Sequence, residues 1–259
     1  MPNTALITGG GKRLGRAMAL HLAGRGMDVV VHYAHSADGA DEVVAEAKAL
    51  GVKAVAVQAD LLDHGETATL IDRAVDAIGK PLDMLINNAS IFEYDNLGTA
   101  TAESWDRHID SNLRAPFFLT QAFAAQAPKA VLRDGEPVAQ AVVVNMIDQR
   151  VRKLTPEFAT YTIAKAGLWA FTQTAAQFLG PDIRVNGIGP GPTMQGERQT
   201  AEHFAKQRAA TILERGSDAT EICRTLDYIL DVDGLTGQLF CLDGGQHLAW
   251  KTPDVLGVE

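Results

Sequence analysis

Tyr161 and Lys165 are the pair of residues in this sequence whose side chains could perform acid–base chemistry together. They lie four positions apart in a segment with helical spacing of its apolar residues, so both side chains share one face of the helix. A phenol, with a pKa of about 10, is a weak proton donor or base near neutral pH. A neighbouring ammonium group stabilises the phenolate and lowers that pKa, which suits the pair for general acid–base catalysis. Because this spacing is common by chance, the prediction depends on what the fold places beside it.

A glycine-rich turn near the amino terminus predicts a binding site for a dinucleotide. It follows the first expected strand and opens a helix, with the sequence Thr8-Gly9-Gly10-Gly11-Lys12-Arg13-Leu14-Gly15. Glycines let the backbone turn tightly and approach a pyrophosphate closely, and the helix that follows offers unpaired N–H groups to an anion. A tight strand–helix connection without a ligand is the alternative. The strand before the turn and the helix after it favour the binding site.

Two features near this turn favour NADPH over NADH. Arg13, beside Lys12, stands where such turns commonly carry a glycine, and a guanidinium there suits an additional phosphate. The second expected strand ends without the Asp or Glu that usually holds the ribose hydroxyls of NAD, and reads His32-Tyr33-Ala34-His35-Ser36. These side chains could instead be solvated surface groups. In an acidic protein, cations gathered at this position favour NADPH.

The elements that must position these residues alternate between short apolar strands and longer amphipathic helices. The strands are expected over Thr4–Thr8, Asp28–Tyr33, Ala54–Gln58, Met84–Asn87, Ala141–Met146, Ile183–Ile188 and Gln238–Leu242. The helices are expected over Leu14–Arg25, Asp38–Leu50, Glu66–Ile78, Ser104–Ala127, Pro156–Leu179, where Pro156 is the first helical residue, and Ala219–Leu230. This alternation predicts an α/β fold, a doubly wound parallel sheet of about seven strands covered by helices on both faces. We expect one Rossmann-type domain over residues 1–259, with a substrate lid at about 189–216.

The amino-acid composition of the chain excludes several classes of function. The chain has 259 residues, 46% of them hydrophobic, and a formal net charge of −9. The acidic balance argues against a nucleic-acid or anionic-membrane binder. The sequence shows no signal peptide, no membrane-spanning stretch and no metal-ligand spacing among its cysteines and histidines, so we expect a cytoplasmic protein that binds no metal.

The motifs together resemble those of the short-chain dehydrogenase/reductase family. They span nearly the whole chain in the family's order: the glycine-rich turn, Asn87-Asn88-Ala89-Ser90, Asn112, Tyr161-Thr162-Ile163-Ala164-Lys165, Arg184-Val185-Asn186, Gly189-Pro190-Gly191 and Asp243-Gly244-Gly245. The resemblance implies a Rossmann-type enzyme that transfers hydride between a nicotinamide and a carbonyl, hydroxyl or imine group. It also implies a homotetramer or homodimer joined through the helices near 104–127 and 156–179 and the C-terminal strand.

By the same resemblance, Tyr161 is the proton donor, Lys165 binds the nicotinamide ribose and tunes Tyr161, and Asn112 supports a proton-relay water. Further cofactor contacts are implied around the adenine, the ribose and the segment after the sixth strand. The residues concerned are Asp60, Leu61, Asn88, Ala89, Ser90, Pro190, Gly191 and Thr193.

One departure from the family pattern sharpens the expected substrate. The family's usual catalytic serine is absent, and Asp148 stands at the equivalent position. This exchange, together with Arg13, resembles the pteridine reductases and the bacterial dihydromonapterin reductases, and Ser90-Ile91-Phe92 resembles their pterin-stacking segment. A carboxylate can accept the N–H groups of a pterin, whereas, unless it is protonated, it would repel the developing alkoxide of a ketone. Ser90, Phe92, Asp148, Tyr161 and Met194 are the expected substrate contacts.

Three functions therefore remain to be distinguished. The favoured interpretation is an NADPH-dependent reductase of pterins such as dihydromonapterin, dihydrobiopterin or dihydrofolate. The alternative is a carbonyl reductase of the same family that acts on a 3-oxoacyl thioester, a sugar or a steroid-like alcohol. A cofactor-binding sensor without chemistry is disfavoured by the presence of Tyr161, Lys165 and Asn112 together.

Overall fold

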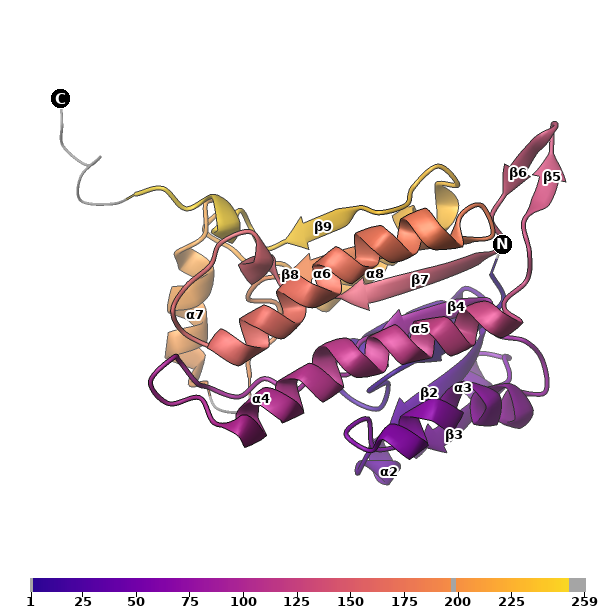
Figure 1. Ribbon diagram of the computed structural model, residues 1–259, viewed down its shortest axis with the longest axis horizontal. Coiled ribbons are helices and arrows are strands. Elements are labelled where there is room, and N and C mark those ends of the chain that lie inside the picture. The colour runs from indigo at the N-terminus through magenta and orange to yellow at the C-terminus, as the bar shows by residue number, and fades with distance from the viewer. Residues whose placement is uncertain (1, 197–198, 252–259) are drawn as a thin grey trace.

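A parallel sheet of seven strands forms the centre of the molecule (Figure 1). The computed structural model describes residues 2–196 and 199–251. The strand order is β3-β2-β1-β4-β7-β8-β9, and every pairing within this sheet is parallel. The strands are β1 Thr4–Ile7, β2 Asp28–Tyr33, β3 Ala54–Gln58, β4 Met84–Asn87, β7 Ala141–Met146, β8 Ile183–Pro190 and β9 Leu239–Leu242. The predicted doubly wound α/β fold of about seven strands is confirmed.

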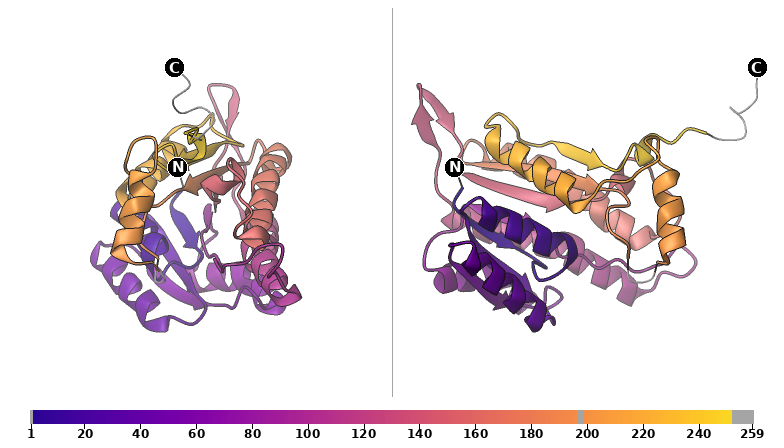
Figure 2. Two further views of the ribbon diagram at one scale, coloured as in Figure 1. Left: turned by 90° about the vertical axis from the view of Figure 1, so that its left-hand side faces the viewer. Right: turned by 180° about the vertical axis from the view of Figure 1, so that it is seen from behind.

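Helices cover both faces of this sheet (Figure 2). On one face lie α1 Arg13–Gly24, α2 Ala37–Ala49 and α8 Ala219–Asp231, and on the other lie α3 His64–Ile78, α5 Ala115–Gln126 and α6 Ala159–Leu179. All six residues of β7 are buried because its side chains meet a helical layer on either side. That double covering explains why the first four residues of the strand, Ala141–Val144, are all apolar.

The carboxyl ends of the parallel strands bring distant segments to one edge of the sheet. The glycine-rich turn follows β1, Asn88 and Ala89 follow β4, Asp148 follows β7, and Pro190 ends β8. Strand order changes direction between β1 and β4, and ligands of doubly wound sheets bind at such a switch point. The fold therefore gathers most of the predicted site residues at this edge.

The helix predicted over Ser104–Ala127 is divided into three parts. It consists of α4 Ala102–Ile109, a π-helical turn over Asp110–Arg114 and α5 Ala115–Gln126. A π turn inserts an extra residue into the helix and is frequent at functional sites. This one contains Asn112, whose side chain the distortion turns toward the loop after β4.

The prediction that Pro156 is the first residue of the next helix is wrong. The α6 helix begins at Ala159, and the residue before it, Phe158, has a left-handed backbone with φ 58°. Pro156 lies in the preceding loop, where its fixed φ suits a turn as well as a helix start.

A short antiparallel hairpin, β5 Val131–Arg133 and β6 Glu136–Val138, was absent from the expected elements. It projects from the body of the molecule (Figure 1). Its turn residues Asp134 and Gly135 both have positive φ, as the tight turns of two-residue hairpins require.

The predicted lid segment, 189–216, contains the end of β8, a loop and the helix α7 Ala201–Ala209; residues 197 and 198 lie outside the described part. Arg208 of α7 donates hydrogen bonds to the carbonyl oxygens of Pro192, Gly216 and Ser217 at 2.7–2.9 Å. These contacts tie both ends of the segment to its helix. The lid role itself stays a prediction.

Within residues 2–196 and 199–251, no helix combines the length and the apolar character that crossing a bilayer requires. The same residues hold no group of three or more His, Cys, Asp or Glu side chains placed to bind a metal ion. Two further single turns of 3-10 helix, Gln149–Val151 and Gln246–Leu248, flank the carboxyl edge of the sheet.

Candidate active site

Asp148 and Tyr161 face each other at the carboxyl edge of the sheet. The Tyr161 hydroxyl donates a hydrogen bond to Asp148 Oδ2 at 3.0 Å, and Asp148 Oδ1 accepts from the backbone N–H of Arg150 at 2.8 Å. Lys165, one helical turn after Tyr161, donates from Nζ to the carbonyl oxygen of Met146 at 2.8 Å. Its Nζ lies 5.7 Å from the centre of the Tyr161 ring. The structure therefore brings a carboxylate, a phenol and an ammonium group together.

The electrostatics of this group favour a protonated phenol. Burial and the negative charge and hydrogen bonding of Asp148 raise the pKa of Tyr161 well above its usual value, and Arg150 and Ser90 oppose the shift only in part. The expected lowering of this pKa by Lys165 is not found; burial and the facing Asp148 carboxylate are the largest influences, and both raise it. Burial also lowers the pKa of Lys165 to about 8 and raises the pKa of Asp148. Tyr161 consequently keeps its proton at neutral pH and can deliver it to a substrate.

Asn112 contacts the loop after β4. Its Oδ1 accepts from the backbone N–H of Ile91 at 3.0 Å, and its Nδ2 donates to the Ile91 carbonyl at 2.8 Å. Both ends of the amide thus hold the segment from Ser90 to Phe92. The part that Asn112 would play toward a relay water stays a prediction.

Three aromatic side chains and one arginine form a connected group beside Tyr161. The Phe92 ring meets Tyr161 edge-on at 4.7 Å and stacks on Phe158 at 4.4 Å with an interplanar angle of 8°. Tyr94 meets Phe158 edge-on at 5.3 Å, and the Arg150 guanidinium lies over the Phe158 ring at 4.7 Å. Sequence reasoning named only Phe92 of this aromatic group; Phe158, three positions before Tyr161, was missed although an aromatic residue so close to the phenol was a usable signal.

The glycine-rich turn is packed too tightly for side chains. A Cβ at Gly15 would lie 2.1 Å from the carbonyl oxygen of Gly9, and Gly9 itself has φ 62°. Asn88 Nδ2 donates to the carbonyl oxygens of Thr8 and Gly9 at 2.8 and 3.2 Å, and the backbone N–H of Ala89 donates to Thr8 Oγ1 at 2.9 Å. The end of β4 therefore holds the turn in place.

The helix that follows the turn is suited to an anion. Within the described chain, α1 starts without a side-chain cap at Lys12 and without an acidic residue in its first turn. Its first N–H groups are left for a ligand, and a phosphate group is the ligand that such a terminus favours. Lys12 is exposed at this end, whereas Leu14 is half-buried and packs on the core. The residues present therefore fit the pyrophosphate of a dinucleotide.

Arg13 has φ 50°, a left-handed conformation that is unfavourable for a residue with a side chain. Its guanidinium crosses to the lid segment and donates to the carbonyl oxygens of Gln195 at 2.7 Å and Met194 at 3.2 Å. The side chain of Arg13, a predicted phosphate contact, is thus hydrogen-bonded to the backbone of Met194, a predicted substrate contact.

His32 differs from its expected place at the cofactor. Its ring is buried beneath the turn, where Nδ1 accepts from the backbone N–H of Gly9 at 3.0 Å and Nε2 donates to the carbonyl oxygen of Ala59 at 2.9 Å. Burial lowers the pKa of His32 to about 4, so the ring is neutral at physiological pH. Its side chain supports the glycine-rich turn and is not available to a phosphate. Burial was the property that the sequence did not reveal here.

The other residues predicted to contact the adenosine part of the cofactor differ in how accessible their side chains are. Tyr33 is half-buried at the end of β2, His35 is exposed, and Ser36 directly precedes α2. Asp60 Oδ1 accepts a hydrogen bond from the backbone N–H of Leu62 at 2.9 Å. The Leu61 side chain lies in the core, so any contact of Leu61 with a cofactor would come from its backbone.

The segment after β8 is held by the chain's last strand. Gly191 donates its N–H to the carbonyl oxygen of Leu242 at 3.0 Å, and a Cβ at Gly191 would come within 2.6 Å of Asp243. Thr193 is buried and its hydroxyl contacts Ser217 Oγ at 2.8 Å. Pro190 is the last residue of β8. These residues lie on the same edge as Tyr161, and the Thr193 hydroxyl is occupied within the protein.

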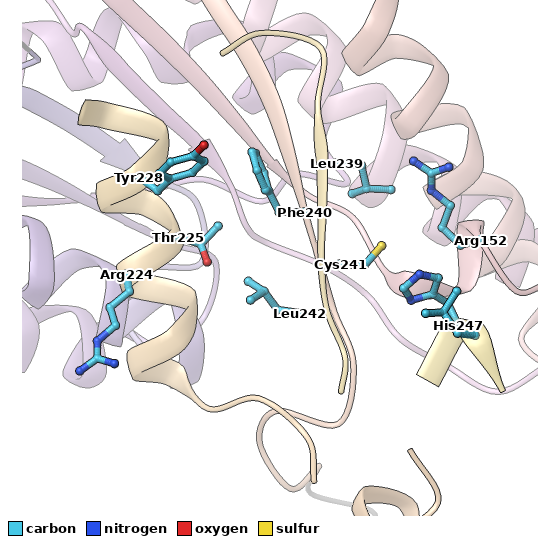
Figure 3. A pocket seen from close by; sticks show the side chains of 10 residues that line it. Arg152, Arg224, Thr225, Tyr228, Leu239, Phe240, Cys241, Leu242 and His247 are labelled. Atoms are coloured by element: carbon cyan, nitrogen blue, oxygen red, sulfur yellow. The ribbon is translucent and has the colours of Figure 1, made fainter. Parts of the chain in front are cut away.

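A separate hollow of about 790 Å³ lies along the edge strand β9 (Figure 3). Phe240 and Leu242 point to the α8 side of the strand, and Leu239 and Cys241 point to the other side, toward Arg152 and His247. None of the predicted catalytic residues lines this hollow. It is therefore a feature of the sheet edge and distinct from the group around Tyr161.

Known proteins support the family assignment. The sequence profile of the short chain dehydrogenase family matches residues 3–219. The crystal structure of FolM alternative dihydrofolate reductase 1 from Brucella suis, in complex with NADP, is similar to this chain with a TM-score of 0.90 and 41% identity, covering 98% of both chains.

Curated sequences give a second comparison. A 3-oxoacyl-[acyl-carrier-protein] reductase from a Synechocystis species is 35% identical over 93% of this chain and 95% of its own length. The 3-oxoacyl-[acyl-carrier-protein] reductase FabG of Staphylococcus aureus is 32% identical over 96% of this chain and 99% of its own length. With its parallel sheet, its glycine-rich turn and its Tyr161–Lys165 pair, the chain belongs to the short-chain dehydrogenase/reductase family.

Proposed function

We propose that this oxidoreductase is an NADPH-dependent reductase of pterins such as dihydromonapterin, dihydrobiopterin or dihydrofolate. The observation that carries the proposal is the Asp148 carboxylate, 3.0 Å from the Tyr161 hydroxyl, where the family pattern has a serine. The Phe92 ring beside it is 49% exposed and offers a surface for a flat heterocycle. Similarity to the alternative dihydrofolate reductase from Brucella suis supports the same substrate class.

NADPH is the proposed cofactor, and it would supply the hydride. The free start of α1 and the turn around Gly9 would hold its pyrophosphate, with Arg13 and His35 near the additional phosphate. Lys165, buried beside Tyr161, would donate to the nicotinamide ribose. NADP is also the ligand named for the Brucella suis structure.

The residues around Tyr161 would manage the protons of the reaction. Reduction of a dihydropterin C=N bond adds a hydride to carbon and a proton to nitrogen, and oxidises NADPH to NADP. Tyr161 holds a proton because its pKa is raised, and Asp148, whose pKa is also raised, can accept a substrate N–H or pass on a proton. Phe92 would orient the ring above them. A ketone would instead place a developing negative charge against the carboxylate.

Reduction of a carbonyl group is the second candidate. Two relatives at 32% and 35% identity are 3-oxoacyl-[acyl-carrier-protein] reductases, which is the specific observation in its favour. Asp148 is the residue that separates the two proposals, because a serine hydroxyl can donate to a ketone oxygen and an ionised carboxylate cannot.

A substrate panel tests the proposal directly. We expect the purified protein to oxidise NADPH with a dihydropterin at least about 100-fold more efficiently, in kcat/KM, than with an acetoacetyl thioester, because mispaired polar groups strongly disfavour the wrong substrate. The decrease in NADPH absorbance gives the rates, with each substrate assayed against both NADPH and NADH. The opposite preference would transfer the assignment to carbonyl reduction.

Changing Arg13 to Gly tests the cofactor preference. Glycine suits the left-handed backbone at this position, so the exchange removes the guanidinium without straining the turn. We expect KM for NADPH to rise about 10- to 100-fold while KM for NADH changes about twofold or less, because only NADPH carries the phosphate that the guanidinium would pair with. Arg16→Ala is the control: it removes another exposed guanidinium of α1, which forms an ion pair with Glu46 of α2. Equal losses for both cofactors would show that Arg13 does not distinguish them.

We also propose that the chain assembles into a homodimer or homotetramer through α5, α6 and the edge of β9. Phe117 and Phe118 of α5 are 42% and 39% exposed, and Phe178 of α6 is 86% exposed. A helix that is apolar on all sides usually has a partner on each of them. The hollow along β9 continues an unpaired strand edge. Light scattering during size-exclusion chromatography measures the number of subunits.

A further inference from the structure

A buried polar cluster lies beneath the aromatic residues beside Tyr161. It consists of Asp95, Ser104, His108 and Thr160, and we call it the Asp95 cluster. Three of its members, Asp95, His108 and Thr160, are at most 3% exposed. They come from the loop after β4, from α4 and from the first turn of α6, and α4 lies beside the start of α6 (Figure 1). The cluster thus joins three segments that the sequence separates by up to 65 positions.

The hydrogen bonds of the cluster run in one direction. The backbone N–H of Glu93 donates to His108 Nε2 at 3.1 Å, so the ring proton is on Nδ1. His108 Nδ1 then donates to Thr160 Oγ1 at 2.6 Å, and the Thr160 hydroxyl donates to Asp95 Oδ2. Burial lowers the pKa of His108, which keeps the ring neutral as this pattern requires. Ser104 Oγ also donates to Asp95 Oδ2, at 3.2 Å, so that the four side chains are joined by hydrogen bonds that end on the Asp95 carboxylate.

Asp95 also caps the helix that carries Tyr161 and Lys165. Within the described chain, Phe158, the residue before the first residue of α6, gives the helix no side-chain cap. The Asp95 carbonyl oxygen accepts from the Phe158 N–H at 2.7 Å, and Asp95 Oδ1 accepts from the Thr160 N–H at 3.2 Å. A carboxylate at a helix amino terminus satisfies free N–H groups and opposes the positive end of the helix dipole. The start of α6 is thereby set by a residue from another segment.

The same contacts join the two sides of the candidate substrate site. Phe92 belongs to the loop that leads to Asp95, and Tyr161 follows Thr160 directly. Phe92 stacks on Phe158, whose backbone Asp95 holds, and meets Tyr161 edge-on at 4.7 Å. The distance and angle between the Phe92 ring and the phenol therefore depend on the Asp95 cluster.

We propose that Asp95, His108 and Thr160 act as positioning residues that set the Phe92 ring relative to the Tyr161 hydroxyl. None of them is a catalytic residue, since each is buried beneath the site. Through this arrangement they determine how a flat substrate lying on Phe92 meets the proton donor. The inference deepens the proposed pterin reduction and rests on it for the identity of the substrate.

Thr160→Val and Thr160→Ser form the matched test. Valine keeps the volume of threonine but removes the hydroxyl that links His108 to Asp95, whereas serine keeps the hydroxyl. We expect Thr160→Val to lower kcat/KM for a dihydropterin about 10- to 100-fold, because small displacements of a reacting geometry have effects of this size. The dissociation constant of NADPH, measured by fluorescence, should stay within about twofold of the wild-type value, as should all constants of Thr160→Ser.

A purely structural cluster would give a different result. Thr160→Val would then unfold at a lower temperature while kcat and KM remained at wild-type values, and the proposal would be overturned. Asp95→Asn provides a second variant, because the single amide oxygen can still accept the Thr160 N–H, whereas the NH2 group in place of Oδ2 cannot accept the Thr160 hydroxyl. Its kcat/KM should fall in the same direction. Wild-type kinetics in both Asp95→Asn and Thr160→Val would contradict the proposal.

Failure of the proposed function would be visible separately. The wild-type protein assayed on a dihydropterin and on an acetoacetyl thioester reports the substrate class, and the ratio of each variant to wild type reports the cluster. If the wild type reduces only the thioester, the pterin proposal fails, and the same variants assayed on the thioester still test whether the cluster positions Tyr161.

Discussion

Replacing Tyr161 with Phe is expected to cause the largest loss of activity, a decrease in kcat of about 10³- to 10⁴-fold, as loss of a positioned general acid does. Phenylalanine retains the ring contacts with Phe92 and His108 and removes only the hydroxyl that donates to Asp148. NADPH binding should stay within about twofold, since the removed hydroxyl would mainly serve the substrate. Initial rates under saturating substrate measure kcat, and fluorescence titration measures cofactor affinity.

The pH dependence of the residual activity gives a second readout of Tyr161→Phe. The hydrogen bond from Tyr161 lowers the pKa of Asp148, while burial raises it more strongly. Without the phenol, the pKa of the Asp148 carboxyl moves further up. As the pH is lowered, a rate that requires ionised Asp148 should therefore begin to fall at a higher pH in the variant than in the wild type. Thr162→Val, an exchange at the next buried hydroxyl of the same helix, is the control for general packing effects. A variant that keeps more than about one tenth of wild-type kcat would remove Tyr161 from the role of proton donor.

The second large effect is expected for Asp148→Ser, which restores the residue type common in the family. Serine can still accept the N–H of Arg150, so the cap of the following turn is preserved. We expect kcat/KM for a dihydropterin to fall about 100- to 1000-fold, because both a proton-transfer group and a charged acceptor are lost. The rate with an acetoacetyl thioester should stay equal or rise, since a hydroxyl can donate to a ketone oxygen.

Asp148→Asn separates the charge from the shape at this position. The amide has the size of the carboxyl group but cannot take up a proton, so its dihydropterin kcat/KM should be low as in Asp148→Ser, without any gain on the thioester. Both rates are read in the same NADPH assay. Unchanged dihydropterin turnover in Asp148→Ser would mean that the carboxylate serves only to cap Gln149–Val151.

The fold could be predicted from the sequence because its strands are encoded locally. The run Ala141–Val144 is apolar throughout, and a strand buried on both faces is the simplest structure for it. The hairpin around Asp134 and Gly135 was missed although the dipeptide Asp-Gly is itself a strong signal of a two-residue hairpin turn. The π turn at 110–114 had no such signal, because its helical periodicity differs from that of an α-helix by only one residue.

The candidate site was predictable only where chemistry is concentrated in short motifs. Tyr161 and Lys165 share a helix face by spacing, and Asp148 lies beside them because β7 ends next to α6. His32 was predicted to contact the cofactor, whereas its ring is buried beneath the turn. The sequence could not show this, because the burial depends on packing against the end of β3, which lies far along the sequence. The Asp95 cluster was invisible for the same reason, since its partners are brought together only by tertiary packing.

The backbone of Arg13 has a consequence for how the protein would respond to laboratory evolution. A side chain in the left-handed region costs roughly 1–2 kcal/mol relative to glycine, so the residue lowers the stability of the turn that it occupies. Selection for heat tolerance alone would favour glycine at position 13 if relief of this backbone outweighs loss of the hydrogen bonds from Arg13 to Met194 and Gln195. If the guanidinium has its proposed role, the selected glycine variants would be more stable to heat but would bind the additional phosphate of NADPH more weakly. The single exchange Arg13→Gly would then be a starting point for engineering a heat-stable variant that uses NADH.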